Sequence, residues 1–389
     1  MQKDRNLWVL VLVCIINSLG FGIIVPVMYT YGKIFGLNGA TLGILTASFS
    51  VAQFFATPVL GALSDKWGRR PLLVISLAGT CISFLLFAEA RSLLFLFAAR
   101  ILDGLTGGNI SVAQAMVADT ATAKNRAQRF GILSSAFAFG FVIGPFIGGV
   151  FNNISPQAPF FFAAGISLIG TLCAAFLLDE TNPTNKATRL NFTNNFKFAS
   201  LITTLQRPII GTAIFTGFLL TMAQFTMIIG FQTFSVDILK ITPAQMGIFL
   251  ACFGLCGIIA QLCVPFFTEV FSSKTIILLL STLFCFVAMA VSGTTSVFLP
   301  FAVCLGVYAL FNGLRNPMLN AIIADNIDQT EQGKVLGINQ SYASIGQTLG
   351  PLAAGLATLL SIHSVFFLSA FYILIATLLC FRLKSKTKA

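Results

Sequence analysis

The chain has 389 residues, of which 57% are hydrophobic and only 9% are charged. In an average soluble domain about a quarter of the residues are charged, so this composition excludes an ordinary soluble protein and predicts an all-α membrane protein with many spans. The formal net charge of +11 does not indicate nucleic-acid binding, because the basic residues flank the apolar segments and report membrane topology.

Twelve apolar segments are long enough to cross a hydrocarbon core of about 30 Å as helices. The first follows Lys3 and Arg5, as a signal peptide would, but it lacks a small-residue cleavage site and is predicted to be a retained helix. The twelve segments lie near residues 7–30, 42–62, 72–90, 93–117, 128–151, 159–178, 209–234, 244–267, 275–293, 297–323, 336–360 and 364–381.

A polar segment rich in Asn, Thr and Lys divides these spans into six and six. The sequence therefore predicts an N-terminal six-helix bundle at 1–178, a cytoplasmic linker at 179–208 and a C-terminal six-helix bundle at 209–389. The linker composition fits either a disordered connection or a segment that lies along the membrane surface.

The basic residues are distributed unevenly between the two ends of the spans. If the N-terminus is cytoplasmic, only Lys33, Arg91 and Lys240 fall on the opposite side. This asymmetry places both termini in the cytoplasm, and the short loops favour a bacterial cytoplasmic (inner) membrane. The nine cysteines form no C-x-x-C pair, so neither a metal site, a disulfide framework nor a cofactor is expected.

Parts of the first half recur in the second half. Ala118-Asp119 recurs as Ala324-Asp325, and Gly144-Pro145 recurs as Gly350-Pro351, both at an offset of 206 positions. A weaker correspondence at an offset of 204 pairs Asp65 with Glu269 and Arg70 with Lys274. One offset kept across helices and a loop predicts two pseudo-symmetric bundles related by duplication, with a substrate site between them near the bilayer midplane.

A charged turn, which we define as Gly61–Pro71, separates the second and third spans. Its sequence is GALSDKWGRRP. Gly61 and Gly68 allow the backbone to bend, and Asp65 can pair with Arg69 or Arg70. The alternative is a solvated basic loop that serves only to fix the orientation of the protein.

Asp103 is the only acidic residue that lies well inside a predicted span. It follows Arg100 by three residues, so the two side chains share one helix face and can pair. An ionisable residue at this depth indicates a functional site, here proton exchange with the aqueous phases; the alternative is a permanent structural ion pair. Gly107, Ser111 and Gln114 continue the same face as a polar stripe, which we expect to face the central cavity.

Other polar residues inside the spans are candidates for a substrate cavity. Arg315 lies beside Asn312, and this face can contact an anionic or zwitterionic group, whereas an arginine bonded to carbonyl groups is the alternative. Single amides also often only join helices. The full predicted cavity set is Asn17, Asn109, Gln114, Gln224, Asn312, Arg315 and Gln340.

The charged turn closely resembles the signature that follows the second helix in the major facilitator superfamily, with Lys66 where that family usually has Arg. The fifth-span pattern Gly140-x-x-x-Gly144-Pro145-x-x-Gly148-Gly149 resembles the antiporter signature of its exporters. The run from Arg100 to Pro145 is similar to the tetracycline-resistance branch of the drug/proton antiporters. The resemblance implies a cytoplasmic gate formed by Gly61, Asp65, Lys66, Gly68, Arg69, Arg70, Asp119 and Arg126. The membrane depth of the acid beside its arginine predicts proton coupling through Asp103 and Arg100.

Asn17 departs from this pattern, because tetracycline exporters commonly carry an acid at that position. We therefore expect a secondary active transporter that works by alternating access and couples efflux of amphipathic molecules or drugs to protons. The alternative is a metabolite or siderophore carrier of the same fold. An enzyme is not expected, since His363 is the sole histidine and no H-E-x-x-H motif occurs. The expected partners are a small-molecule substrate, protons and the lipid bilayer, with no nucleic acid, and a monomer suffices.

Overall fold

The computed structural model describes residues 2–122, 125–182, 198–271, 273–327 and 331–383. These residues form helices joined by short turns, so the prediction of an all-α protein is confirmed. The chain divides into two compact units, which we call unit 1 and unit 2. Unit 1 contains Met1–Asn38, Ser48–Phe196 and Ile241–Cys252, and unit 2 contains Gly39–Ala47, Lys197–Lys240 and Phe253–Ala389.

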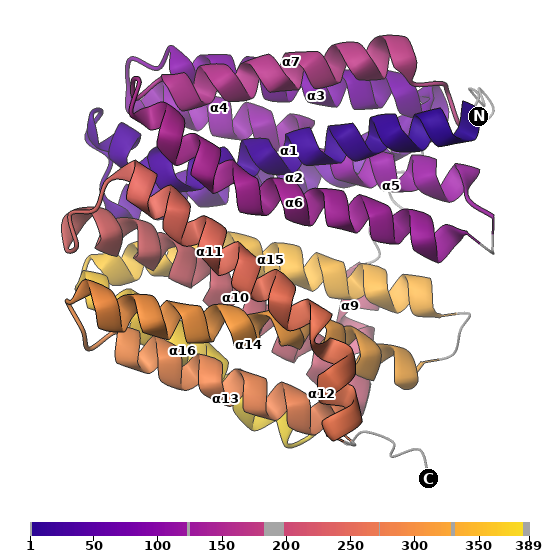
Figure 1. Ribbon diagram of the computed structural model, residues 1–389. Helices are drawn as coiled ribbons and strands as arrows, with labels where there is room; N and C mark the ends of the chain where they lie inside the picture. The colour runs from indigo at the N-terminus through magenta and orange to yellow at the C-terminus, as the bar shows by residue number, and fades with distance from the viewer. Residues whose placement is uncertain (1, 123–124, 183–197, 272, 328–330, 384–389) are drawn as a thin grey trace. The chain divides into compact units, whose positions relative to one another are not determined.

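In unit 1, long apolar helices lie side by side (Figure 1). Helix α1 packs on α6 and α7, and α3 packs on α4 and α7. Leu10, Val13, Leu73, Leu77 and Ala113 are almost fully buried in the core between them. The helices are α1 (Gln2–Lys33), α3 (Arg69–Ala88), α4 (Leu93–Thr106), α5 (Asn109–Thr120), α6 (Arg126–Asn152), α7 (Ala158–Leu177) and the larger part of α2 (Gly39–Trp67).

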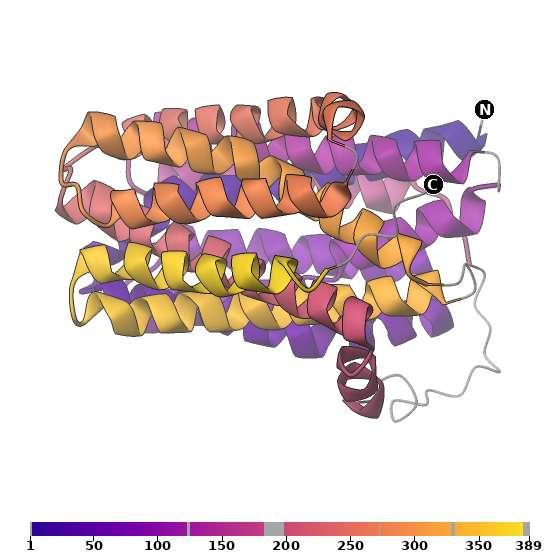
Figure 2. The same cartoon turned by 90° about the horizontal axis from the view of Figure 1, so that it is seen from below.

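Unit 2 repeats this packing scheme with different helices (Figure 2). Here α10 packs on α15 and α16, and α13 packs on α14 and α16. The correspondence with α1, α6, α7, α3 and α4 is the arrangement expected of a duplication. The helices are α9 (Phe198–Leu205), α10 (Pro208–Asp237), α12 (Val264–Val270), α13 (Lys274–Ser292), α14 (Phe298–Asp325), α15 (Gln332–Thr358) and α16 (Ile362–Cys380), while α11 (Pro243–Leu262) contributes to both units.

Eleven helices in the described residues are long and apolar enough to cross a membrane. The twelfth expected span, near 336–360, lies within α15, which has 27 residues but is not among the eleven. Its composition explains the difference, because α15 is rich in Gly, Ser and Gln rather than in large apolar residues. Most of the predicted linker, residues 183–197, lies outside the described residues, and α9 forms part of the remainder.

The span expected at 93–117 is interrupted. Helix α4 ends at Thr106 and α5 begins at Asn109, with Gly107 and Gly108 between them. Lipid offers no hydrogen bonds to the backbone groups that such a break releases. The Gln53 side chain from α2 supplies one, because its amide nitrogen donates to the Gly107 carbonyl at 3.1 Å.

The glycines of α6 let its backbone approach that of α1. A Cβ at Gly144 would lie 2.8 Å from the Leu19 carbonyl oxygen and 2.9 Å from the Cα of Gly22. A Cβ at Gly140 would collide with Ser18, and one at Gly148 would lie 2.5 Å from the Ile23 carbonyl oxygen. The predicted antiporter pattern thus forms a close helix contact every four residues.

The same contact recurs in unit 2. A Cβ at Gly350 of α15 would lie 2.6 Å from the Met222 carbonyl oxygen of α10, and the Thr226 hydroxyl donates to the Gly350 carbonyl at 3.1 Å. The remaining glycine of the α6 pattern, Gly149, faces Pro243 and Ala244, which begin α11 within unit 1. Close backbone packing is therefore common to both units.

Gly144→Ala is expected to lower the free energy of unfolding of the purified protein by about 1–3 kcal/mol. The added methyl group overpacks the contact and forces the two backbones apart. Gly131→Ala on the same helix is the matched control, since nothing lies within 4 Å of a Cβ there. It should be neutral or stabilising, because Ala favours helix over Gly by up to about 1 kcal/mol. Thermal unfolding of the two variants measures the difference, and equal stabilities would contradict the assigned packing.

Candidate functional site

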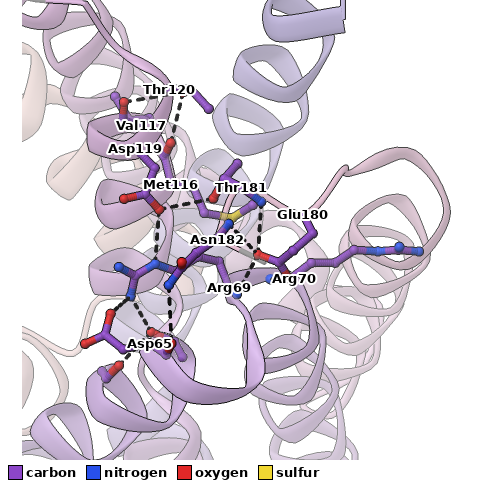
Figure 3. Close-up of polar contacts among 12 residues, drawn as sticks. Asp65, Arg69, Arg70, Met116, Val117, Asp119, Thr120, Glu180, Thr181 and Asn182 are labelled. Carbon is purple, nitrogen blue, oxygen red and sulfur yellow. Dashed lines mark hydrogen bonds and ion pairs between the residues drawn. The ribbon is translucent and has the colours of Figure 1, made fainter. Parts of the chain in front are cut away.

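The charged turn is a tight backbone reversal between α2, which ends at Trp67, and α3, which begins at Arg69 (Figure 3). Gly68 joins them with φ 102° and ψ 153°, a conformation that residues with a Cβ rarely adopt. A Cβ at this position would also collide with the carboxylate of Glu180. Both the backbone conformation and the available space therefore require glycine.

Glu180 lies just beyond the end of α7 and caps the start of α3. Its two carboxylate oxygens accept the backbone N–H groups of Arg69 at 2.8 Å and of Arg70 at 3.1 Å. Helix N-termini expose unpaired N–H groups and a partial positive charge, both of which a carboxylate satisfies. The same carboxylate accepts the backbone N–H groups of Thr181 at 2.9 Å and Asn182 at 3.0 Å, so it holds its own segment in place as well.

The Arg69 side chain gathers acidic groups from two other helices. Its guanidinium lies 2.5 Å from Asp65 at the end of α2 and 3.2 Å from Asp119 near the end of α5. It also donates to the Ser64 hydroxyl at 2.7 Å. The Thr181 hydroxyl donates to Asp119 at 3.2 Å. We call this set of contacts, together with the Glu180 cap, the turn network; it joins α2, α3, α5 and the segment after α7.

The structure places the other predicted gate residues in different roles. The Arg70 side chain donates to the Ala175 carbonyl of α7 rather than to an acid. Arg126 is exposed at the start of α6, and the bond described for it is from its backbone N–H to the Thr122 carbonyl, so it does not join the turn network. Gly61 has open space beside it, and Lys66 is half-buried.

Unit 2 contains a reduced form of this network. Lys274, the first residue of α13, lies 2.5 Å from Asp325 at the end of α14. The predicted correspondence of Lys274 with Arg70 needs a correction, because the arginine that binds the equivalent Asp119 is Arg69. Arg207 binds Glu331 at 2.7 Å, and this hydrogen bond and charge raise the pKa of Arg207 above its ordinary value.

Arg100 and Asp103 lie together on α4. Their closest atoms, Nη1 and Oδ2, are 3.6 Å apart, and the side chains are 2% and 13% exposed. The guanidinium also stacks over the Phe49 ring of α2 at 4.2 Å, which a cation favours. Within the described residues, Nε and Nη1 of Arg100 form no hydrogen bond. The predicted pair is present, but it is held loosely.

Two residues of the predicted cavity set meet in unit 1, and two meet in unit 2. The Asn109 amide at the start of α5 donates to the Asn17 side-chain oxygen of α1 at 2.7 Å. In unit 2, Arg315 of α14 donates to the side-chain oxygen of Gln224 of α10. Because α1 corresponds to α10, these contacts occupy equivalent places in the two halves.

The other cavity candidates are placed individually by the structure. Gln114 on α5 and Gln340 on α15 are exposed, and Asn312 on α14 is half-buried with no hydrogen bond to its side-chain oxygen in the described part of the chain. No group of three or more potential metal ligands occurs among the described residues. The polar positions therefore divide into two helix-to-helix contacts and several separate side chains.

Glu180 was not predicted from the sequence as a gate residue. The available signal is the acidic pair Asp179-Glu180 directly after the sixth span. These two adjacent acids have different partners. Asp179 binds Arg5 at the start of α1 at 2.8 Å, whereas Glu180 caps α3. Sequence alone does not distinguish these partners, which lie more than a hundred residues away.

The fold and these sites define a polytopic membrane transporter with duplicated halves. The family model of the Major Facilitator Superfamily matches residues 10–239 and 213–389. The chain belongs to the Major Facilitator Superfamily and is a secondary transporter, an integral multi-pass membrane protein that acts on small-molecule substrates.

Several curated proteins are similar to the chain over most of its length. Multidrug resistance protein 2 of Bacillus subtilis is 29% identical, covering 96% of this chain and 94% of the relative. The class C tetracycline resistance protein of Escherichia coli is 28% identical, covering 90% and 89%. Quinolone resistance protein NorA of Staphylococcus aureus is 26% identical, also covering 90% and 89%.

Solved structures share the fold at low sequence identity. A bacterial homologue of the human lysosomal transporter Spinster superposes with a TM-score of 0.81 at 13% identity, covering 98% of this chain and 96% of the other. The human organic anion transporter MFSD10 superposes with a TM-score of 0.70 at 19% identity, covering 97% and 99%. At these identities the likeness concerns the fold alone.

Glu180→Ala is expected to loosen the first turn of α3, because two backbone N–H groups lose their acceptor. Losing a helix cap costs about 1 kcal/mol, which corresponds to roughly fivefold faster amide exchange at Arg69 and Arg70. Hydrogen–deuterium exchange with mass spectrometry on the full chain measures this. Glu89→Ala, at the other end of α3, is the control and should leave those amides unchanged. Equal protection in both variants would refute the cap.

Proposed function

We propose that this transporter exports amphipathic small molecules, including drugs, in exchange for protons. The relatives reported above are named for multidrug, tetracycline and quinolone resistance, and this supports efflux. Metabolite or siderophore carriage, the alternative considered from the sequence, is not favoured. The observation that carries the proton coupling is the Arg100–Asp103 pair within α4.

The geometry of this pair suits a carboxylate that gains and loses a proton. At 3.6 Å the ion pair is longer than a direct hydrogen bond, so protonation of Asp103 breaks no short contact to Arg100. The contact of the guanidinium with the Phe49 ring does not depend on the charge of Asp103. Protonation of Asp103 therefore changes the charge of α4 while Arg100 keeps its contact with the Phe49 ring. The two protonation states of Asp103 can then favour different access states of the transporter.

The turn network acts in this proposal as a cytoplasmic latch. The positive-inside rule supports a cytoplasmic position for this network and for both termini. A single exposed ion pair contributes little to stability, but several shared partners hold one geometry better than isolated pairs. The network joins four segments of unit 1. In this proposal those segments shift relative to one another during alternating access, and the contacts of the network break or rearrange with them.

The proposal needs a small-molecule substrate, protons and the lipid bilayer as partners. It needs no catalytic chemistry and no nucleic acid, and one copy of the chain suffices for the transport cycle. The bacterial relatives and the short loops support a location in the bacterial inner membrane.

Asp103→Asn is expected to abolish ethidium-dependent proton movement in proteoliposomes with an imposed pH gradient, because the amide does not exchange a proton. Asp103→Glu should retain part of the flux, and Glu89→Gln serves as a control for removing an exposed acid. Size-exclusion profiles and thermal unfolding establish that each variant is folded. Undiminished flux in the folded Asn variant would show that the pair is purely structural.

Arg69→Gln is expected to lower the initial rate of ethidium transport severalfold, because Asp65 and Asp119 lose their shared cation. The transport rate of Arg69→Lys should lie between those of this variant and the wild type. An ammonium group keeps the positive charge but cannot donate in the planar, bidentate geometry of a guanidinium. Arg91→Gln, in the exposed turn before α4, removes the same charge elsewhere and should transport normally. Rates in Arg69→Gln that match the wild type would exclude a latch built on this residue.

A further inference from the structure

Arg315 is a buried cation without a carboxylate partner in the described part of the chain. Its side chain lies within α14, ten residues before the end of that helix, and is only 3% exposed. A charge at such a place in a membrane helix is costly unless it is paired. Arg100, the comparable buried arginine of unit 1, does have an acid beside it.

The contacts of Arg315 satisfy only part of its hydrogen-bonding capacity. Nη1 donates to the Leu220 carbonyl at 2.6 Å, and Nη2 donates to the Gln224 side-chain oxygen. Both acceptors belong to α10 and both are neutral. Nε is buried and has no acceptor among the described residues. The guanidinium is thus oriented by α10, while its charge is not neutralised.

Two other polar groups on the same face of α14 also lack partners. The Tyr308 hydroxyl and the Asn312 side-chain oxygen are buried without a hydrogen bond in the described residues. Residues 308, 312 and 315 are spaced four and three apart, so they lie along one face of the helix. Buried polar atoms in folded proteins are nearly always paired, so three orphan atoms on one face indicate a missing ligand or water.

The neighbouring surface of unit 2 is polar as well. Asn316 and Asn320 of α14 and Gln340 of α15 are exposed, and the Asn339 amide of α15 donates to Asn320 at 3.3 Å. Exposed amides within membrane helices face water or protein rather than lipid. A hydrated face therefore adjoins the helix face that carries Arg315.

We propose that Arg315, with Tyr308 and Asn312, binds the anionic group of a transported amphipathic molecule, such as a carboxylate or sulfonate. This inference rests on the proposed function and specifies its substrate class. The anion accepts from Nε of Arg315 and from the Tyr308 hydroxyl, and its negative charge supplies the partner that Arg315 lacks among the described residues. Arginine suits this task because its charge-assisted hydrogen bonds to oxyanions are strong and directional.

The test compares binding of three fluorescent probes to the purified full chain in lipid nanodiscs. Pyrenebutyrate carries a carboxylate, its methyl ester carries none, and ethidium is a cation. The wild type is expected to bind pyrenebutyrate at least roughly tenfold more tightly than the ester, because a buried charge-assisted hydrogen bond is gained. Empty nanodiscs measure and remove the contribution of partition into lipid.

Two variants assign the preference to the Arg315 site. Arg315→Gln should abolish the difference between acid and ester, and Arg382→Gln, at the exposed end of α16, should preserve it. Gln224→Glu keeps the side-chain shape and places an acid against the guanidinium, so it should weaken pyrenebutyrate binding and remove the difference between acid and ester. This second variant keeps the test valid if Arg315→Gln does not fold.

The outcomes separate this inference from the proposed function. Equal affinities of the wild type for acid and ester, or an acid preference that survives in folded Arg315→Gln or Gln224→Glu, overturn the anion site. Proton flux through Asp103 is measured independently in proteoliposomes, once with ethidium and once with pyrenebutyrate. Flux with no acid preference refutes only the anion site, whereas acid preference without flux from either probe supports the site and refutes proton-coupled efflux.

Discussion

Lipid offers no hydrogen bonds, so every polar group that enters the hydrocarbon core has to find its partner within the protein. The interrupted α4–α5 span meets this requirement through Gln53, which binds the Gly107 carbonyl released by the break. Arg315 meets it only in part, through the Leu220 carbonyl and the Gln224 side chain of a neighbouring helix. The first of these contacts needs α2 and α4 at a short distance, and Gly104 allows it, because a Cβ there would lie 2.5 Å from the Phe49 carbonyl oxygen.

The two units share one arrangement of packed helices but carry different residues at equivalent contacts. At the contact between α1 and α5, two neutral amides meet, whereas at the equivalent contact in unit 2 a guanidinium meets an amide. The ionic pairs at the helix ends also recur, and among the described residues the carboxylate cap formed by Glu180 belongs to unit 1. Duplication thus preserved the helix packing while each half acquired its own distribution of charge. In the described part of the chain, the buried arginine of unit 1 has an acid beside it, and that of unit 2 has no carboxylate partner.

Hydropathy and internal repetition were sufficient to predict the helical architecture, because span length and apolar composition are local properties of the sequence. The Arg100–Asp103 pair was also predictable, since helical periodicity brings residues three apart together. The Glu180 cap was not, because it joins segments 111 positions apart. The break at Gly107 and Gly108 was missed for a related reason: two glycines fit a close-packed helix equally well, and the partner that stabilises the break comes from α2.

Gly68 also constrains how this chain can diverge. Every substitution at that codon that encodes another amino acid adds a Cβ where the backbone conformation and the Glu180 carboxylate leave no room. Two positions earlier, Lys66 is half-buried, and it takes no part in the contacts that define the turn network. Position 68 therefore accepts only glycine, whereas the near neighbour at position 66 tolerates substitution.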